Sequence, residues 1–284
     1  MSLDLIYNGE FFPIDKPILS VSNRGFRYGD GLFESIRVIN GVAYNFDAHF
    51  SRLTQGMEVF EINIPEYFTQ DFFENQIKSL LQRNGIHEGG RVKLSIYRKG
   101  EISSYFSETN EPGYIIEAEN FPFNKFLLNP EGIDIDIYNE IPKQKSAYSV
   151  YKTTNAFFYV NAINWGQKKG MIDVLLINEN NHIIESTNSN FFIVSNGVLY
   201  TPPLSNGCVG GTMRMKLINL ALENGIKVYE SSISPGHLLS CDEIILTNAI
   251  QGIKWVRSYK TKRYFHKISD KLIEMLNEDT LINS

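Results

Sequence analysis

The stretch HIIESTNSNFFIVSNGVLY, residues 182–200, decides the fold of the second half of the chain. Its apolar residues form short runs that a polar segment and the dipeptide Asn196-Gly197 separate. Asn-Gly between apolar runs is the strongest short-range signal for a β-hairpin, so we expect strands over residues 190–194 and 198–200. Residues 182–186 predict a further strand, and Glu185 lies where that strand enters the polar segment.

The rest of the second half also alternates between strand and helix patterns. A short helix is expected to begin at Ser234-Pro235, because Ser is a good N-cap and Pro fits the first turn. Asn224-Gly225 is a typical stop for the helix before it. The remaining strands are expected over residues 133–141, 173–178, 228–232 and 243–247, and the helices over residues 154–169, 213–223 and 268–277.

The first half predicts a smaller α/β domain. Its expected strands cover residues 5–8, 18–21, 33–39, 42–44, 91–97 and 113–119, and its helices cover residues 48–60 and 69–83. Residues 120–131 have little pattern and contain Pro122 and Pro130, which is typical of a linker. We therefore expect an α+β chain with domains over residues 1–119 and 132–284, joined by a linker over residues 120–131.

Composition excludes several classes of function. The 284 residues are 43% hydrophobic and 21% charged, an ordinary globular balance that allows a sizeable core. The net charge of −5 and the lack of a basic run argue against a nucleic-acid partner. No apolar run has the length needed to cross a bilayer, and Met1-Ser2-Leu3-Asp4 does not begin a signal peptide. Two cysteines without CxxC spacing, and five scattered histidines, predict a cytoplasmic protein without a metal site.

Four features could carry chemistry, although each has an ordinary structural explanation when taken singly. Lys152 lies between an aromatic stretch and an expected helix, where a lysine can become nucleophilic. Glu185 ends a strand, where its carboxylate could hold a cationic ring nitrogen. Residues 209–214, VGGTMR, enter a helix whose N-terminal amides suit a phosphate. Arg52 could add a forked contact to that phosphate.

Taken in order along the chain, these features resemble the class IV aminotransferase family, the fold-type IV enzymes that use pyridoxal 5'-phosphate (PLP). The matching stretches are NRGFRYGDGLFES at residues 23–35, HFSRL at 49–53, Lys152, Glu185 followed by NFF at 190–192, LYTP at 199–202 and GTMR at 211–214. The resemblance covers nearly the whole chain. It implies two α/β domains with the cofactor in the cleft between them.

The resemblance also implies residue roles. Lys152 matches the Schiff-base lysine, which also moves a proton. Glu185 would keep the ring nitrogen protonated so that the ring accepts electrons, with Asn190 supporting the strand end. The implied cofactor-binding residues are Arg52, Lys152, Glu185, Asn190, Gly211, Thr212, Met213 and Asn248, and the implied substrate contacts are Tyr28, Phe33 and Arg98.

Within the family, several positions differ between branches. Met213 and Thr247-Asn248-Ala249-Ile250 are similar to the 4-amino-4-deoxychorismate lyases, which release pyruvate and 4-aminobenzoate for folate synthesis. D-amino-acid aminotransferases carry an arginine where Ser103 stands. Phe33-Glu34-Ser35, in contrast, looks like an aminotransferase of branched-chain or related amino acids. We expect the lyase, with the aminotransferase as the alternative. Either would act on a small amino or aminodeoxy carboxylate, and the family implies a homodimer.

Overall fold

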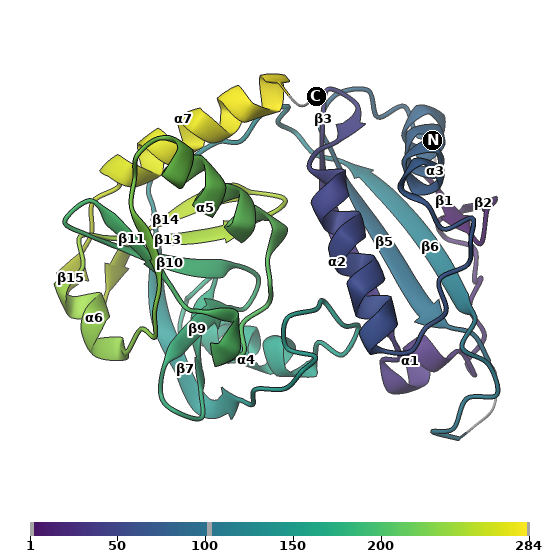
Figure 1. Ribbon diagram of the computed structural model, residues 1–284, viewed down its shortest axis with the longest axis horizontal. Helices are drawn as coiled ribbons and strands as arrows, with labels where there is room; N and C mark the ends of the chain where they lie inside the picture. The colour runs from purple at the N-terminus through teal and green to yellow at the C-terminus, as the bar shows by residue number, and fades with distance from the viewer. Residues whose placement is uncertain (1–2, 101–103, 283–284) are drawn as a thin grey trace. The chain divides into compact units, whose positions relative to one another are not determined.

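The computed structural model describes residues 3–100 and 104–282 (Figure 1). The chain divides into two compact units. The first contains the residues up to Lys125, the segment Tyr151–Asn155 and the residues from Thr280 onward, and the second contains Phe126–Val150 and Ala156–Asp279. The short segment Tyr151–Asn155 thus belongs with the N-terminal part of the chain, although residues of the second unit precede it.

The first unit is built on an antiparallel sheet. Within the described residues this sheet has six strands, in the order β2-β1-β6-β5-β3-β4. The strands are β1 (Asp4–Tyr7), β2 (Glu10–Pro13), β3 (Gly31–Ile39), β4 (Val42–Ala43), β5 (Gly90–Arg98) and β6 (Pro112–Asn120). Its helices are α1 (Arg24–Tyr28), α2 (Phe46–Val59) and α3 (Gln70–Arg83). Helix α2 lies against this sheet in Figure 1 and contacts β3.

Periodic burial explains the core of the first unit. Strand β5 buries every second residue over most of its length, so one face packs inward. Helix α3 buries Phe73, Ile77, Leu80 and Leu81, which lie on one side at helical spacing. Thr69 caps α3 by accepting a hydrogen bond from the Phe72 backbone N–H at 3.1 Å. The predicted helix over residues 69–83 is confirmed to within one residue.

The expected strand over residues 18–21 is wrong. These residues form turns and bends, and Val21 is 76% exposed. Strand β1 pairs with β6 and with β2, which follows the tight turn at Asn8 and Gly9 and was not predicted. Both turn residues have positive φ, 50° and 91°, as a two-residue hairpin turn requires. Helix α1, which begins just after the turns, was not predicted either.

The second unit carries a larger mixed sheet. Within the described residues it has nine strands, in the order β12-β11-β10-β13-β14-β7-β8-β9, with β15 paired to β14. The strands are β7 (Ile133–Lys143), β8 (Val174–Asn178), β9 (Ile183–Ser186), β10 (Asn190–Ser195), β11 (Val198–Thr201), β12 (Val228–Glu230), β13 (Glu243–Asn248), β14 (Gly252–Tyr259) and β15 (Lys262–Arg263). The helices are α4 (Phe157–Gln167), the 3-10 turn η1 (Leu204–Asn206), α5 (Thr212–Glu223), α6 (Pro235–Ser240) and α7 (Lys267–Ile282).

Most expected elements of the second unit are confirmed, including the hairpin β10–β11 at Asn196-Gly197. Strand β14 was not predicted, and the helix expected from residue 154 begins only at Phe157. The reason is tertiary: Thr153 bridges to Leu32, and the Thr154 N–H donates to the Gly31 carbonyl at 3.0 Å. That pairing holds Thr153 in a β-bridge with Leu32, so the helix begins only after the bridge. The α+β class itself is confirmed, since each unit combines helices with a sheet.

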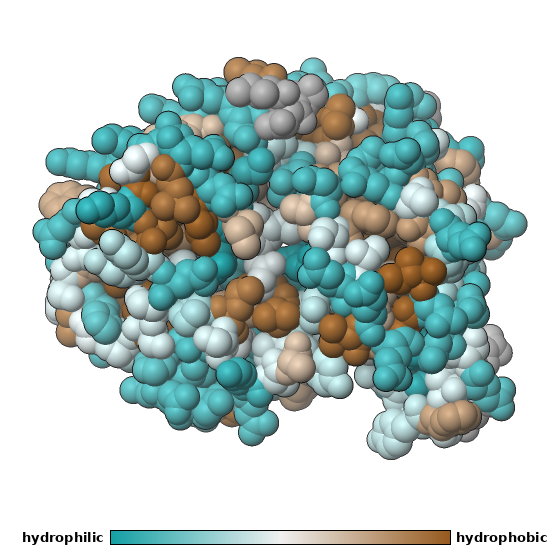
Figure 2. Space-filling model, in the orientation of Figure 1, coloured by the Kyte–Doolittle hydropathy of each residue, from teal (hydrophilic) through white to brown (hydrophobic). Residues whose placement is uncertain are grey.

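Surface and core follow the usual division between polar and apolar residues. Figure 2 shows brown apolar residues in separate patches within a mostly polar face. Of the helices in the described part of the chain, none is both long and apolar enough to span a membrane.

Candidate functional site

Glu185, in the second unit, is a buried acid that accepts three hydrogen bonds. It lies on β9 opposite Leu176 of β8, and its side chain is 3% exposed. The Val209 backbone N–H donates to Oε2 at 2.8 Å. The Lys143 ammonium donates to Oε1 at 2.5 Å, and the Tyr159 hydroxyl donates to the same oxygen at 3.0 Å. Three donors, one of them a cation, therefore surround this buried carboxylate.

Asn190 holds the same peptide segment from the neighbouring strand. Its Nδ2 donates to the Val209 carbonyl at 2.7 Å, while Glu185 accepts from the Val209 N–H. The two strand residues therefore clamp one residue of the loop that leads into α5. A side chain at Gly211 would break the clamp, because a Cβ there would overlap Asn190 Oδ1.

Helix α5 begins with features that suit an anion. Gly211 is the N-cap, with Thr212 and Met213 as the first helical residues, both buried. The first amides of a helix have no acceptor within the helix, and the helix dipole adds positive potential there. Met213 has no hydroxyl, so only its backbone can donate to an anion. This end of α5 can hold a phosphate without any cationic side chain.

Asn248, at the end of β13, is engaged in a turn. Its Oδ1 accepts the backbone N–H groups of Ile250 at 3.1 Å and Gln251 at 2.9 Å. Its Nδ2 donates to Ser189 Oγ at 3.1 Å. Since Ser189 directly precedes Asn190, the Asn248 side chain links the end of β13 to the start of β10.

In the first unit, Arg52 is oriented by an acid on the adjacent strand. Arg52 and His49 lie three residues apart on α2 and thus on one face. Arg52 Nε donates to Glu34 Oε1 at 2.8 Å, and its Nη2 donates to Oε2. His49 Nδ1 lies 2.6 Å from Glu34 Oε2. Glu34, on β3, therefore fixes both side chains.

The electrostatics of this cluster favour an ionised Glu34. Burial by itself raises the pKa of Glu34, but the charge of Arg52 and the hydrogen bond from His49 outweigh it and lower the pKa to about 2. Burial lowers the pKa of His49, and Glu34 opposes that effect. The positive charges of Arg52 and Lys152 also lower the His49 pKa, which shows that Lys152 lies near this cluster.

Lys152 is held on the edge of β3. The Phe33 backbone N–H donates to the Lys152 carbonyl at 2.9 Å. The Lys152 ammonium lies over the Phe33 ring, 4.6 Å from its centroid, a distance typical of a cation–π contact. The first unit thus brings together Lys152, Arg52 and Phe33.

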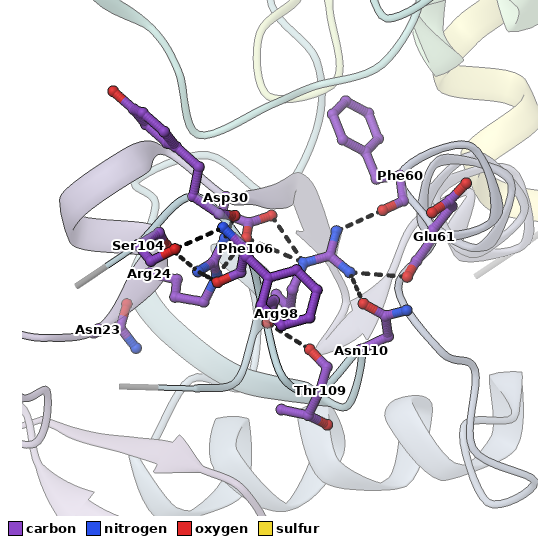
Figure 3. Close-up of polar contacts among 12 residues, drawn as sticks. Asn23, Arg24, Asp30, Phe60, Glu61, Arg98, Ser104, Phe106, Thr109 and Asn110 are labelled. Carbon is purple, nitrogen blue, oxygen red and sulfur yellow. Dashed lines mark hydrogen bonds and ion pairs between the residues drawn. The ribbon is translucent and has the colours of Figure 1, made fainter. Parts of the chain in front are cut away.

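Arg98 belongs to a different cluster of the first unit (Figure 3). Tyr28 lies beside another member of this cluster, with the Arg24 guanidinium 5.2 Å from its ring centroid. Arg98 Nε donates to Asp30, its Nη1 donates to the Glu61 carbonyl at 2.9 Å and to Asn110, and its Nη2 donates to the Phe60 carbonyl at 2.6 Å. These bonds fix the orientation of the Arg98 guanidinium within the first unit.

Arg24 bonds the same Asp30 oxygen as Arg98, Oδ2, and ties residues 104–106 to α1. Its Nε donates to Asp30 at 2.8 Å, and its terminal nitrogens donate to the carbonyls of Ser104, Tyr105 and Phe106 (Figure 3). The Tyr28 ring lies 5.4 Å from that of Tyr105. Ser103, which stands where D-amino-acid aminotransferases carry an arginine, lies outside the described residues.

The structure divides the predicted residues between the two units. Sequence reasoning missed four residues that orient them: Glu34 and His49 beside Arg52, and Lys143 and Tyr159 beside Glu185. The spacing of three between His49 and Arg52 was a usable signal, because it places both on one helix face. No local pattern indicated Lys143 or Tyr159.

Known proteins are similar to this chain over most of its length. A family described as amino-transferase class IV matches residues 31–259. The chain is 25% identical over 248 residues to a D-alanine aminotransferase of Bacillus licheniformis, covering 87% of this chain and 84% of the relative. It is also 25% identical over 235 residues to an aminodeoxychorismate lyase of Vibrio harveyi, covering 82% and 84%.

Solved structures show the same fold. A branched-chain aminotransferase of Thermoproteus uzoniensis with norvaline superposes with a TM-score of 0.91 at 22% identity, covering 100% of this chain and 96% of that one. A T.th. branched-chain amino acid aminotransferase with pyridoxamine 5'-phosphate gives 0.89 at 19% identity, with the same coverage. These likenesses assign the fold of class IV aminotransferases.

Proposed function

The chain belongs to the class IV aminotransferase family, and we propose that it is a 4-amino-4-deoxychorismate lyase that releases pyruvate and 4-aminobenzoate. It is an enzyme of the PLP-dependent aminotransferase and lyase group, and PLP is its cofactor. When bound, PLP supplies an electron sink for the substrate carbon that loses its proton. The residues of the two units fit this cofactor in chemical type, with an anion for its ring nitrogen, donors for its phosphate and an amine for its aldehyde.

Each residue then has a defined task. Glu185, held by the Val209 N–H, would accept the N–H of the cofactor's ring nitrogen. Arg52, oriented by Glu34, and the first amides of α5 bind the phosphate. Lys152 would hold the cofactor through its aldehyde, and the Lys152 amine would take a proton from the substrate carbon. Elimination of pyruvate leaves an aromatic ring, so the overall reaction needs no oxidant or second substrate.

Met213 and Asn248 are the two residues that favour the lyase assignment over the aminotransferase. Met213 is 2% exposed and brings no hydroxyl to the start of α5. The amide of Asn248 links β13 to Ser189. Both residue types are similar to the lyase branch.

An aminotransferase of branched-chain or related amino acids is the second candidate. Phe33-Glu34-Ser35 favours it, and Glu34 is the acid that orients Arg52. The two reactions differ in how they leave the cofactor. An aminotransferase converts PLP to its amine form and releases a 2-oxo acid, whereas a lyase returns it unchanged.

The deciding experiment is a product assay on the purified, PLP-loaded protein. With aminodeoxychorismate as substrate, pyruvate and 4-aminobenzoate should form in equal amounts. With L-leucine, L-glutamate or D-alanine, the absorbance of bound PLP should persist. Bleaching by an amino acid, with no pyruvate from aminodeoxychorismate, would reverse the choice in favour of the aminotransferase.

The pathway, the cellular location and the oligomeric state of the enzyme are part of the same proposal. A lyase of this kind supplies 4-aminobenzoate to folate biosynthesis and works in the cytoplasm, and the family resemblance implies a homodimer. Sedimentation of the loaded protein at micromolar concentration tests the dimer, because a mass of a single chain would exclude it.

A further inference from the structure

We propose that Lys143 is a positioning residue that shares the Glu185 carboxylate with the cofactor's ring nitrogen and thereby weakens the protonation of that nitrogen. The inference rests on the proposed function, in which Glu185 faces the ring nitrogen. Lys143 ends β7, and its side chain is 12% exposed. Its ammonium lies 2.5 Å from Glu185 Oε1 and 2.8 Å from the Tyr159 hydroxyl oxygen.

The hydrogen bonds around Glu185 leave room for one more donor. An ionised carboxylate offers about four acceptor positions, two on each oxygen. Lys143 and Tyr159 occupy both positions on Oε1, and the Val209 N–H occupies one on Oε2. Oε2 can therefore accept the ring N–H while Lys143 keeps its place. The ammonium and the ring nitrogen would then be neighbours on one carboxylate.

The charge balance of this arrangement is unusual. A carboxylate carries one negative charge, and the Lys143 ammonium already neutralises it across a buried contact. A protonated ring nitrogen would add a second positive charge beside the first. A like charge within about 4–6 Å disfavours a charged group by about 1–3 pH units. The ring nitrogen should therefore hold its proton less firmly here than beside an unpaired glutamate.

The other titratable groups facing Glu185 do not remove this effect. Burial, together with the Glu185 charge, raises the pKa of Tyr159 well above its ordinary value of 10, so this hydroxyl stays neutral and donates. Burial, again with the Glu185 charge, raises the pKa of Cys208 to about 11, so that thiol is neutral as well. The Arg214 guanidinium is paired with Glu230 at 2.7 Å. Lys143 is thus the cation bonded directly to Glu185.

The test follows the protonation of the ring nitrogen directly. The protein is loaded with PLP carrying ¹⁵N in the ring, and the ¹⁵N chemical shift is recorded against pH. Lys143→Met should raise the pH midpoint of the ring-nitrogen titration by about one pH unit. Lys143→Arg keeps the positive charge and should leave the midpoint near that of the wild type. Lys145→Met is the matched control, because Lys145 is an exposed lysine two residues further along.

Glu185→Gln separates this inference from the proposed function. If Glu185 faces the ring nitrogen, this variant lowers the midpoint. A lowered midpoint in Glu185→Gln with no change in Lys143→Met would overturn the role of Lys143 and leave that of Glu185 standing. If the pH midpoint changes in neither Glu185→Gln nor Lys143→Met, the proposed roles of Glu185 and Lys143 are both overturned. If Lys143→Met does not fold, Lys143→Gln, which keeps a donor but no charge, makes the same comparison.

Discussion

Removal of the Glu34 charge is the sharpest test of how the first unit orients Arg52. Glu34 is 2% exposed and is bonded by Arg52 and His49. Its pKa falls from an ordinary 4.5 to about 2, because these partners outweigh the cost of burial. At roughly 1.4 kcal/mol for each pH unit, this lowering corresponds to about 3 kcal/mol of stabilisation. Glu34→Gln should therefore lower the free energy of unfolding by about 3 kcal/mol at pH 7.

The sign of the pH dependence follows from the lowered pKa. A carboxyl whose folded pKa is depressed stabilises the fold above its unfolded pKa and loses that contribution as pH falls through the folded value. The stabilisation by Glu34 should be complete above pH 4.5 and disappear toward pH 2. About half of it should remain near pH 3. The gap between wild type and Glu34→Gln should close over the same range.

Urea unfolding, followed by far-UV circular dichroism at several pH values, measures both effects. Glu117→Gln is the matched control, since Glu117 pairs with Lys93 in the same unit but is 39% exposed. A surface pair of that kind contributes about 0–1 kcal/mol. The reasoning fails if Glu34→Gln unfolds within about 1 kcal/mol of the wild type at pH 7, or if the gap between the two proteins does not change with pH.

Three further predictions concern the cofactor. Borohydride reduction of the PLP-loaded protein followed by peptide mapping should place the label on Lys152, and a label on Lys143 would show that the amine beside Glu185 is the reactive one. Arg52→Ala should weaken PLP binding by about 2–3 kcal/mol, the scale of charge-assisted hydrogen bonds; an unchanged affinity in a fluorescence titration would mean that Arg52 only pairs with Glu34. Gly211→Ala should displace the Asn190 side chain, because the new Cβ would overlap its Oδ1. The variant should bind PLP more weakly than the wild type. The control Gly236→Ala, whose new Cβ meets only Ser234 Oγ at 3.7 Å, should not; equal affinities in the two variants would contradict the role of Gly211 beside Asn190.

Local pattern in the sequence determined most of the secondary structure. Burial with a period of two defines β5, and burial at helical spacing defines α3, so both were predicted nearly to the residue. The hairpin at Asn196-Gly197 followed from its turn residues. The wrong strand at residues 18–21 has the same origin, because apolar residues alone do not show whether a partner strand is available.

The motifs along the chain also indicated the family, because each places particular residue types at a fixed spacing and the motifs follow one another in a fixed order. Glu185 and Asn190 were predicted as a pair in this way, and the structure brings both to the Val209 peptide. The start of α4 was not predictable, since Thr153 and Thr154 pair with β3, more than 100 residues earlier along the chain.

Only the tertiary structure decided which side chains surround the predicted ones. Lys143 and Glu185 are separated by 42 residues, and Glu34 and Arg52 by 18. Their contacts depend on which strands become neighbours in a sheet and which helix covers it. A local pattern reports the face on which a residue lies, but not the partner opposite that face. The sequence by itself therefore determined the elements and the family, while the fold decided the charge that each buried carboxylate meets.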